Sequence, residues 1–382
     1  MKIVFTGAGT GGHFYPLVAI AEAIHEIAAE RQLVTPQLYY FAPEPYDQES
    51  LFANSMIFVR IDAGKVRRYF SIQNAIDILH TIFGFIDAIY ELFRIYPDVI
   101  ISRGGYGSVP VTLAANLIGI PVIVHESDSK PGRANLLAAK RAERIGIAFP
   151  SAASYFPDKV KDKIALVGIP IRREVAKPEP EGARQELGLD PTLPTVFVIG
   201  GSSGSQRINE TVLASLPDLV GYANVIHQTG KNLFEAVQGT AKAILLDNPN
   251  ASRYHPFAYL SAQSIRRAAG AADIIVSRAG STAIAEISLW KKPSILIPIP
   301  ESVSHDQRTN AYAYAHTGAC VVLEEANLTP HVLVSEIKRI TGDKALAAQM
   351  AAKGSTFMPG DAAKLIADEA IRIALSHEEP AH

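Results

Sequence analysis

The chain begins the same structural unit twice, and this repetition limits the folds it can adopt. An apolar run at Lys2–Phe5 leads through a glycine-rich turn, Thr6–Gly12, into helical apolar spacing from Phe14 to Ala29. The same order recurs between Thr195 and Leu216, with Gly200–Ser205 as the turn. Strand, glycine turn and helix in this order are typical of βαβ units. Two such starts predict two α/β halves.

A second repeat supports this prediction. Two apolar runs, Asp98–Gly105 and Asp273–Gly280, both end in Ser-Arg-x-Gly. Further predicted strands alternate with helical stretches, at Gln37–Phe41, Pro121–His125, Ile164–Val167, Asn224–Gln228, Pro293–Pro298 and Cys320–Leu323. Alternation of this kind predicts parallel sheets, so the expected fold class is α/β with two Rossmann-like domains.

The length of 382 residues fits two domains at about 100–200 residues each. The predicted boundary lies near Gly168, ahead of a Pro/Glu-rich stretch at 177–182. We therefore expect domains at 1–167 and 168–359, with a last helix at about 360–382 that packs back on the first.

The composition narrows the function classes. With 36 Lys and Arg against 38 Asp and Glu, the net charge is −2, so we expect no nucleic-acid partner. The single cysteine, Cys320, cannot form an intramolecular disulfide or a multi-cysteine zinc site, which fits a reducing compartment. We expect no export signal, because Met1–Phe5 leads directly into a glycine loop. We expect no membrane span, because acidic residues interrupt the longest apolar region, 72–96.

The first glycine turn, Gly7–Gly12, has the pattern G-x-G-x-x-G between a strand and a helix. There, backbone amides and a helix N-terminus bind phosphate, although a plain tight turn also fits. Alone, the motif suggests a dinucleotide site in which Glu44 would accept hydrogen bonds from the ribose. His13 follows the turn and Pro16 favours the first helical turn. The imidazole is a candidate acid or base, with a structural role as the alternative.

The second half offers another candidate site for a phosphate-bearing ligand. Gly200–Ser205 supplies bare amides and hydroxyls for a diphosphate. After the turn Ser277–Ser281, Glu286 falls in the second helical turn, where it could accept ribose hydroxyl groups or lie on a solvated face. Gln307 is a candidate contact for a sugar hydroxyl. No Asp-x-Asp or P-loop motif occurs, so we expect no metal.

An apolar helix is predicted from Ile72 to Phe93, directly after the basic residues Lys65, Arg67 and Arg68. It could be buried between the sheet and its neighbours, or it could touch a membrane surface. Residues 60–144 carry 11 Lys and Arg against 8 Asp and Glu, a local charge of +3 that favours an anionic lipid or a pyrophosphate substrate.

Several motifs occur together in order along residues 1 to about 320. They are Thr6–Pro16, Gly64–Phe70, Gly104–Ser108, His125–Asp128, Val167–Arg172, Gly200–Gly204, Ser277–Gly280 with Glu286, and Gln307–Ala311. With this set the chain resembles the MurG family of glycosyltransferases, the peptidoglycan N-acetylglucosaminyltransferases of family 28. The resemblance implies a GT-B fold, with two Rossmann-like domains facing across a cleft, and an inverting reaction without metal or cofactor.

The resemblance also implies the substrates and the location. The donor would be UDP-N-acetylglucosamine. The acceptor would be the 4-hydroxyl of lipid I (undecaprenyl-pyrophosphoryl-MurNAc-pentapeptide), and the product lipid II. The enzyme would serve peptidoglycan synthesis, and so cell shape and division, as a peripheral protein on the cytoplasmic face of the cell membrane.

The resemblance assigns roles to residues by position. His13 would be the catalytic base, with Asp128 and Glu126 as further candidates. Substrate contacts would come from Thr10, Gly11, Gly12, Tyr106, Arg172, Ser202, Gly204, Ala258, Gly280, Ser281, Thr282, Glu286 and Gln307. Where many relatives have His-Glu-Gln-Asn, this chain has His125-Glu126-Ser127-Asp128. A GT-B transferase with another lipid or small-molecule acceptor is the second interpretation, and an NAD-binding oxidoreductase resting on Gly7–Gly12 and Glu44 a distant third.

Overall fold

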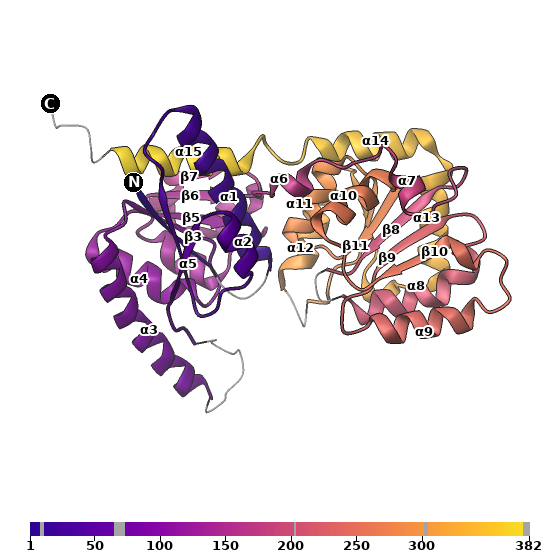
Figure 1. Cartoon of the computed structure of the whole chain (residues 1–382), viewed down its shortest axis with the longest axis horizontal. Coiled ribbons are helices and arrows are strands. Elements are labelled where there is room, and N and C mark those ends of the chain that lie inside the picture. Colours follow the sequence, from indigo (N-terminus) through magenta and orange to yellow (C-terminus); the bar gives the residue numbers. More distant parts are fainter. Residues whose placement is uncertain (8–10, 65–72, 202–203, 302–304, 377–382) are drawn as a thin grey trace. The chain divides into compact units, whose positions relative to one another are not determined.

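A computed structural model describes residues 1–7, 11–64, 73–201, 204–301 and 305–376 of the chain. The chain divides into two compact units, Met1–Arg172 with Pro359–His382, and Arg173–Met358 (Figure 1). The boundary falls after Arg172, five residues beyond the expected one. Each unit is a parallel sheet covered by helices on both faces.

The sheet of the first unit has seven parallel strands in the order β3-β2-β1-β4-β5-β6-β7. The strands are β1 (Lys2–Thr6), β2 (Gln37–Ala42), β3 (Met56–Arg60), β4 (Val99–Ser102), β5 (Val122–Glu126), β6 (Arg144–Ile147) and β7 (Ile164–Leu166). The strand order reverses between β1 and β4. In open α/β sheets, ligands bind beyond the carboxyl ends of the strands at such a point.

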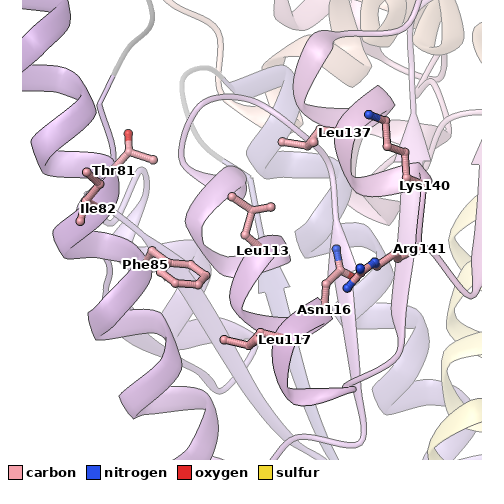
Figure 2. Close-up of a pocket in the computed structure, with 9 residues that line it drawn as sticks. All are labelled: Thr81, Ile82, Phe85, Leu113, Asn116, Leu117, Leu137, Lys140 and Arg141. Atoms are coloured by element: carbon pink, nitrogen blue, oxygen red, sulfur yellow. The ribbon is translucent and has the colours of Figure 1, made fainter.

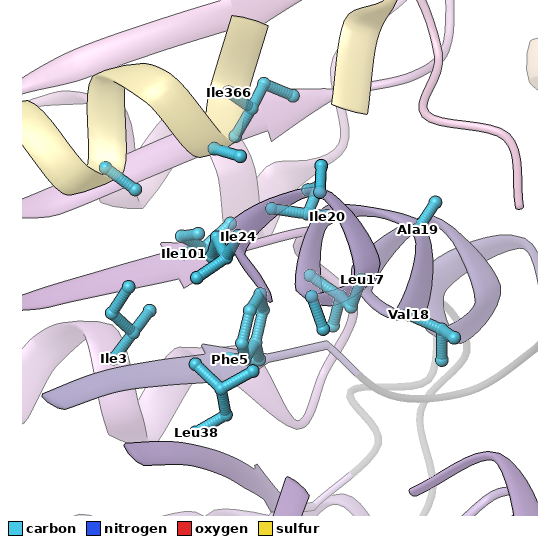
Figure 3. Close-up of a cluster of buried hydrophobic side chains, with 14 of the residues drawn as sticks. Ile3, Phe5, Leu17, Val18, Ala19, Ile20, Ile24, Leu38, Ile101 and Ile366 are labelled. Carbon is cyan, nitrogen blue, oxygen red and sulfur yellow. The ribbon is translucent and has the colours of Figure 1, made fainter. Parts of the chain in front are cut away.

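Alternating side chains of β1 build two cores. Ile3 and Phe5 pack with α1 and α15, and Figure 3 shows Ile366 of α15 near Ile20 of α1. Val4 packs on the opposite face with side chains of α3, α4 and α5. The helices of this unit are α1 (Gly11–Glu30), α2 (Gln48–Ala53), α3 (Gln73–Ile95), α4 (Ser108–Ile118), α5 (Arg133–Ala139), α15 (Ala362–Leu375) and the short η1 (Pro150–Tyr155) and η2 (Asp158–Lys163).

The sheet of the second unit has six parallel strands in the order β10-β9-β8-β11-β12-β13. The strands are β8 (Thr195–Ile199), β9 (Asn224–Gln228), β10 (Tyr254–Phe257), β11 (Ile274–Ser277), β12 (Ser294–Leu296) and β13 (Cys320–Val322). The helices are α6 (Arg173–Ala176), α7 (Ala183–Glu186), α8 (Gln206–Leu219), α9 (Phe234–Ile244), α10 (Ala262–Ala271), α11 (Ser281–Trp290), α12 (His305–Ala315), α13 (Pro330–Gly342), α14 (Lys344–Ser355), η3 (Ala251–Arg253) and η4 (Glu325–Asn327). Here the order reverses between β8 and β11.

Helix α3 is buried on one side only and exposes apolar side chains on the other. Ala88 and Leu92 are buried against the sheet, whereas Phe83, Tyr90 and Phe93 are 61%, 66% and 74% exposed. Gly84 faces inward, where a Cβ atom would overlap the carbonyl oxygen of Asp62. The interpretation of α3 as a helix buried between the sheet and its neighbours is therefore wrong for its outer surface, which carries these exposed apolar side chains.

Candidate active site

The candidate site of the first unit lies where the strand order reverses. Helix α1 begins at Gly11, three residues before the expected start, so Gly11, Gly12 and His13 form its first turn and not a loop. Thr10 lies outside the described residues. Because the first amides of a helix have no partner within it, this turn can present N–H groups to an anion.

The ring of His13 has a defined tautomer. Its Nδ1 lies 3.1 Å from the carbonyl oxygen of Arg103. A carbonyl oxygen can only accept, so Nδ1 carries the proton and Nε2 holds the lone pair that a base needs. Burial lowers the pKa of His13, the Arg103 guanidinium lowers it further, and the charge of Asp128 opposes them. At neutral pH the ring is therefore an uncharged base.

Arg103, after β4, connects the start of α1 to His125 of β5. The sequence did not reveal this role. Its side chain is buried, and Nη2 donates to the Gly12 carbonyl oxygen at 2.8 Å. Its Nη1 donates to Nδ1 of His125, whose Nε2 donates to the carbonyl oxygen of Gly168 at 2.7 Å. Burial lowers the pKa of Arg103 to about 10, so the guanidinium keeps its charge at neutral pH. The sequence signal that could have pointed to this arginine is the Ser-Arg-x-Gly motif, which occurs once in each half of the chain.

Glu126 holds the loop that carries Asp128. Its carboxylate accepts from the backbone N–H groups of Asp128 and Gly132, at 2.9 and 3.0 Å, and from Nδ2 of Asn135 at 2.8 Å. Burial, and then the charge of Asp128, raises the pKa of Glu126 to about 7. Asp128 itself is half-buried. The structure thus gives the two candidate carboxylates different environments.

Two further predicted contacts lie in this unit. Tyr106 is half-buried in the loop after β4, and burial and then the charge of Glu44 raise its pKa. The loop needs glycine at Gly104, where φ is +74° and a Cβ atom would lie 2.7 Å from Oδ1 of Asn135. The guanidinium of Arg172 stacks on Tyr15 of α1, 3.8 Å from the ring centroid.

The second unit repeats the arrangement after β8 and β11. Gly204 has φ of +77°, and a Cβ atom there would overlap the carbonyl oxygen of Thr229. Ser205 caps α8 by accepting from the N–H of Ile208, and Nη2 of Arg278 donates to the same Oγ at 2.6 Å. Arg278 occupies in this unit the position that Arg103 occupies in the first. Ser202 lies outside the described residues.

Helix α11 presents the other predicted donor contacts. Gly280 is its N-cap residue, Ser281 and Thr282 lie in its first turn, and half-buried Glu286 lies in its second turn. The first turn has no acidic side chain, so its amides remain suited to an anion. Gly280 and Ser281 follow the carboxyl end of β11 by three and four residues.

Gln228 is a residue of this site that the sequence did not single out. Its Oε1 accepts from the N–H of Leu260 and its Nε2 donates to the Gly201 carbonyl oxygen, at 3.0 and 3.2 Å. It thereby ties the glycine turn to the segment holding half-buried Ala258. Gln307, the predicted contact for a sugar hydroxyl, accepts at Oε1 from the N–H of Ile299 at 3.2 Å.

Among the residues that the structure describes, no group of three or more His, Cys, Asp and Glu side chains is placed to hold a metal ion. The predicted metal-free reaction remains a prediction. In both units a helix begins where the strand order reverses, α1 in the first and α11 in the second, and such a helix N-terminus is suited to an anion.

Two Rossmann-like units, each with a helix that begins where the strand order reverses, are the architecture of GT-B enzymes. Sequence comparison agrees: the glycosyltransferase family 28 N-terminal domain matches residues 3–147, and the family 28 C-terminal domain matches residues 195–366. The chain belongs to glycosyltransferase family 28. This membership decides against the oxidoreductase that rested on Gly7–Gly12 and Glu44.

Curated relatives carry a more specific name. A UDP-N-acetylglucosamine--N-acetylmuramyl-(pentapeptide) pyrophosphoryl-undecaprenol N-acetylglucosamine transferase of Clostridium kluyveri is 35% identical over 345 residues, 90% of this chain and 92% of that protein. Its namesake from Treponema denticola is 32% identical over 347 residues, 87% of this chain and 86% of that protein.

Solved structures share the fold. The crystal structure of Acinetobacter baumannii MurG aligns with a TM-score of 0.73 at 23% identity, over 97% of this chain and 99% of that chain. A UDP-GlcNAc 2-epimerase from Neisseria meningitidis aligns with a TM-score of 0.66 at 13% identity, over 97% and 100%. Since a transferase and an epimerase share this architecture, the fold alone does not assign the reaction.

Proposed function

We propose that the protein transfers N-acetylglucosamine from UDP-N-acetylglucosamine to the 4-hydroxyl of the MurNAc residue of lipid I, forming lipid II in peptidoglycan synthesis. The names of the curated relatives supply the substrates. The observation that carries the chemistry is His13, whose Nδ1–H donates to the Arg103 carbonyl and leaves Nε2 as an uncharged base. An acceptor hydroxyl needs such a base when it attacks a sugar.

The proposed reaction is a single displacement that inverts the anomeric carbon. The acceptor oxygen forms a bond to C1 of N-acetylglucosamine and gives its proton to Nε2 of His13. The bond between C1 and the UDP oxygen breaks, and UDP leaves with the electron pair. His13 becomes an imidazolium, which the nearby charge of Asp128 stabilises. The amides at the start of α11 stabilise the charge on the departing diphosphate without a metal.

The second unit would hold the donor nucleotide. Ser281 and Thr282 would contact the diphosphate from the first turn of α11, and Glu286 would accept the ribose hydroxyl groups. Gly204, Ala258 and the turn with Ser202 would line the rest of the nucleotide. In the first unit, Thr10, Gly11 and Gly12 would face the donor sugar and the acceptor diphosphate, and Tyr106 would be a further substrate contact. Arg172, at the end of this unit, would contact the donor nucleotide.

Helix α3 and its neighbours fit a peripheral contact with a membrane. A groove of about 520 Å³ with mostly apolar walls lies between α3, α4 and α5. Figure 2 shows its lining residues, with the cationic side chains of Lys140 and Arg141 on the side next to α5. Its lining residues are Thr81, Ile82, Phe85, Leu113, Asn116, Leu117, Leu137, Lys140 and Arg141. Exposed apolar side chains beside surface cations favour an anionic lipid surface. We propose that this face docks on the cytoplasmic side of the cell membrane.

The part of the chain that the structure describes includes no helix both long and apolar enough to cross a membrane. The basic residues Lys65, Arg67 and Arg68, which the sequence placed beside α3, lie outside the described residues.

Calorimetry of UDP binding tests the donor site. Glu286→Ala should weaken UDP binding, because a charge-assisted hydrogen bond to the ribose is worth about 1.5–3 kcal/mol, roughly a 10- to 150-fold loss of affinity. The wild type should bind equally well in EDTA. Glu235→Ala, on the exposed first turn of α9, is the matched control. Unchanged UDP affinity in folded Glu286→Ala, or loss of wild-type binding in EDTA, would contradict the proposal.

A further inference from the structure

The first turn of α1 lacks one of its own hydrogen bonds. In an α-helix, the carbonyl of Gly12 accepts from the N–H of residue 16, and here that residue is Pro16, which has no N–H. Nη2 of Arg103 donates to this carbonyl oxygen at 2.8 Å. A side chain from beyond β4 thus replaces the helical donor that proline removes.

The same arginine is fixed from two other directions. Its Nη1 donates to Nδ1 of His125, and His125 is held in turn by the Gly168 carbonyl. Its main-chain carbonyl accepts from Nδ1 of His13. Arg103 is 1% exposed, so the guanidinium has little room to move. Backbone and side chain of one residue therefore both act on the turn that carries His13.

We propose that Arg103 is a positioning residue for His13: its guanidinium completes the first turn of α1 where Pro16 leaves the Gly12 carbonyl without a helical donor, and its carbonyl sets the His13 tautomer. This inference rests on the proposed role of His13 as the base. Burying a charged guanidinium is costly, and fixing one geometry is a recognised reason to retain such a group. A displacement of about 1 Å in a reacting group can cost about 100-fold in rate.

Removing the guanidinium also changes the electrostatics at His13. The charged groups that act on the ring are Arg103, from the loop after β4, and Asp128, from the loop after β5. Arg103 disfavours the imidazolium and Asp128 favours it. Without Arg103, His13 should take up its proton at a higher pH.

Nitrogen-15 NMR of histidine-labelled full-length protein tests the link between Arg103 and His13 without any substrate. The His13 signal is assigned by its loss in His13→Ala. In Arg103→Met the titration midpoint should move to higher pH, whereas Arg103→Lys, which keeps the charge, should retain the low midpoint. Arg31→Met, which changes a half-exposed arginine paired with Asp368, is the control and should match the wild type. An unchanged midpoint in Arg103→Met overturns the inference.

Steady-state kinetics with UDP-N-acetylglucosamine and lipid I test the catalytic consequence. Arg103→Met should lower kcat about 10- to 100-fold, leave the KM for the donor within about twofold, and shift the acidic limb as in the NMR titration. Added to His13→Ala, it should cause no further loss, because both changes act through one group. Losses that multiply would overturn the inference.

The two proposals fail differently. If His13→Ala keeps its kcat and its acidic limb, the proposed base is wrong, while the NMR titration still decides whether Arg103 positions the ring. If Arg103→Met does not fold, Arg103→Gln takes its place under the same criteria, since its amide keeps one donor without the charge.

Discussion

The chemical character of His13 comes from its neighbours. The Arg103 carbonyl selects the tautomer, and burial together with the Arg103 guanidinium keeps the ring uncharged. Asp128 acts in the opposite sense, and its effect matters when the ring gains a proton during the reaction. An acid–base residue works best when its charged form is disfavoured at rest and stabilised in the transition state.

The substitution His13→Ala should lower kcat by about 10²- to 10⁴-fold, the usual contribution of a general base. The pKa of His13 is lowered from 6.5, so the wild-type acidic limb of kcat/KM should lie below pH 6.5, with activity lost as the pH falls through that pKa. The variant should lack this limb. Rates measured from pH 5 to 8 check both statements.

The competing role for His13 is ground-state positioning of the acceptor diphosphate. In that case the variant would show a raised acceptor KM and nearly intact kcat. A variant with its acidic limb and kcat preserved would transfer the base role to Asp128, since Glu126 is occupied by three donors.

Glu126 should prove to be mainly a structural residue. Glu126→Ala leaves two backbone N–H groups and the Asn135 amide without their acceptor, at about 1–3 kcal/mol for an unsatisfied buried group. Thermal unfolding should show a lower Tm, whereas Asp158→Ala, at an exposed carboxylate, should not. A wild-type Tm for Glu126→Ala would contradict this view.

The pH dependence of unfolding gives a second check on Glu126. Because its pKa is raised from 4.5 to about 7 in the native state, the folded protein holds this proton after the unfolded chain has released it. This contribution is fully present below about pH 4.5 and is lost as the pH rises through 7. Glu126→Ala should lack it.

At the scale of elements, the sequence predicted the strands at the middle of each sheet, including β1 and β4 in the first and β8 and β11 in the second. The bounds of β8 and β9 match because both are central, buried strands with turn residues at their ends. It did not predict β3, β6 or β10. β10 contains Pro256, which is tolerated because this edge strand pairs with β9 on one side. β6 reads Arg-Ile-Gly-Ile, with a glycine that weakens the strand pattern.

Helix α3 shows a different limit. Its apolar spacing predicted a helix, but apolar residues surround most of its circumference, so the pattern could not show which side faces the sheet. The side of α3 that carries Gly84 faces inward, because the backbone of Asp62 approaches so closely there that a Cβ atom would not fit. The apolar side chains left outside, including Phe83 and Phe93, then form the proposed membrane face.

Liposome flotation tests that face. Phe83→Asp combined with Phe93→Asp should abolish binding to anionic vesicles with little change in Tm, because both side chains are exposed. Lys140→Gln should weaken binding by about 1 kcal/mol, and the effect should diminish in high salt. Leu246→Asp, at a 74% exposed side chain of the second unit, is the control. Wild-type binding by the Phe83/Phe93 variant would contradict the proposed face.

At the scale of the molecule, the two units use one plan for two tasks. Each places a glycine turn and an arginine at the point where its strand order reverses, Arg103 in one and Arg278 in the other. The sequence showed the repeated motifs, and so predicted a candidate site in each unit. It could not show the bonds from Arg103 to Gly12 or from Gln228 to Leu260, because those partners meet only through the sheet order.

The most direct test of the proposed transfer is product analysis with purified protein, defined lipid I and UDP-N-acetylglucosamine in EDTA. The proposal predicts a product heavier than lipid I by one N-acetylhexosamine residue, with one UDP released per product. When UDP-glucose replaces UDP-N-acetylglucosamine, no glycosylated product should form. His13→Ala should form the same product more slowly. Absence of this product with folded, UDP-binding protein, or transfer to a different acceptor in preference to lipid I, would contradict the proposed function.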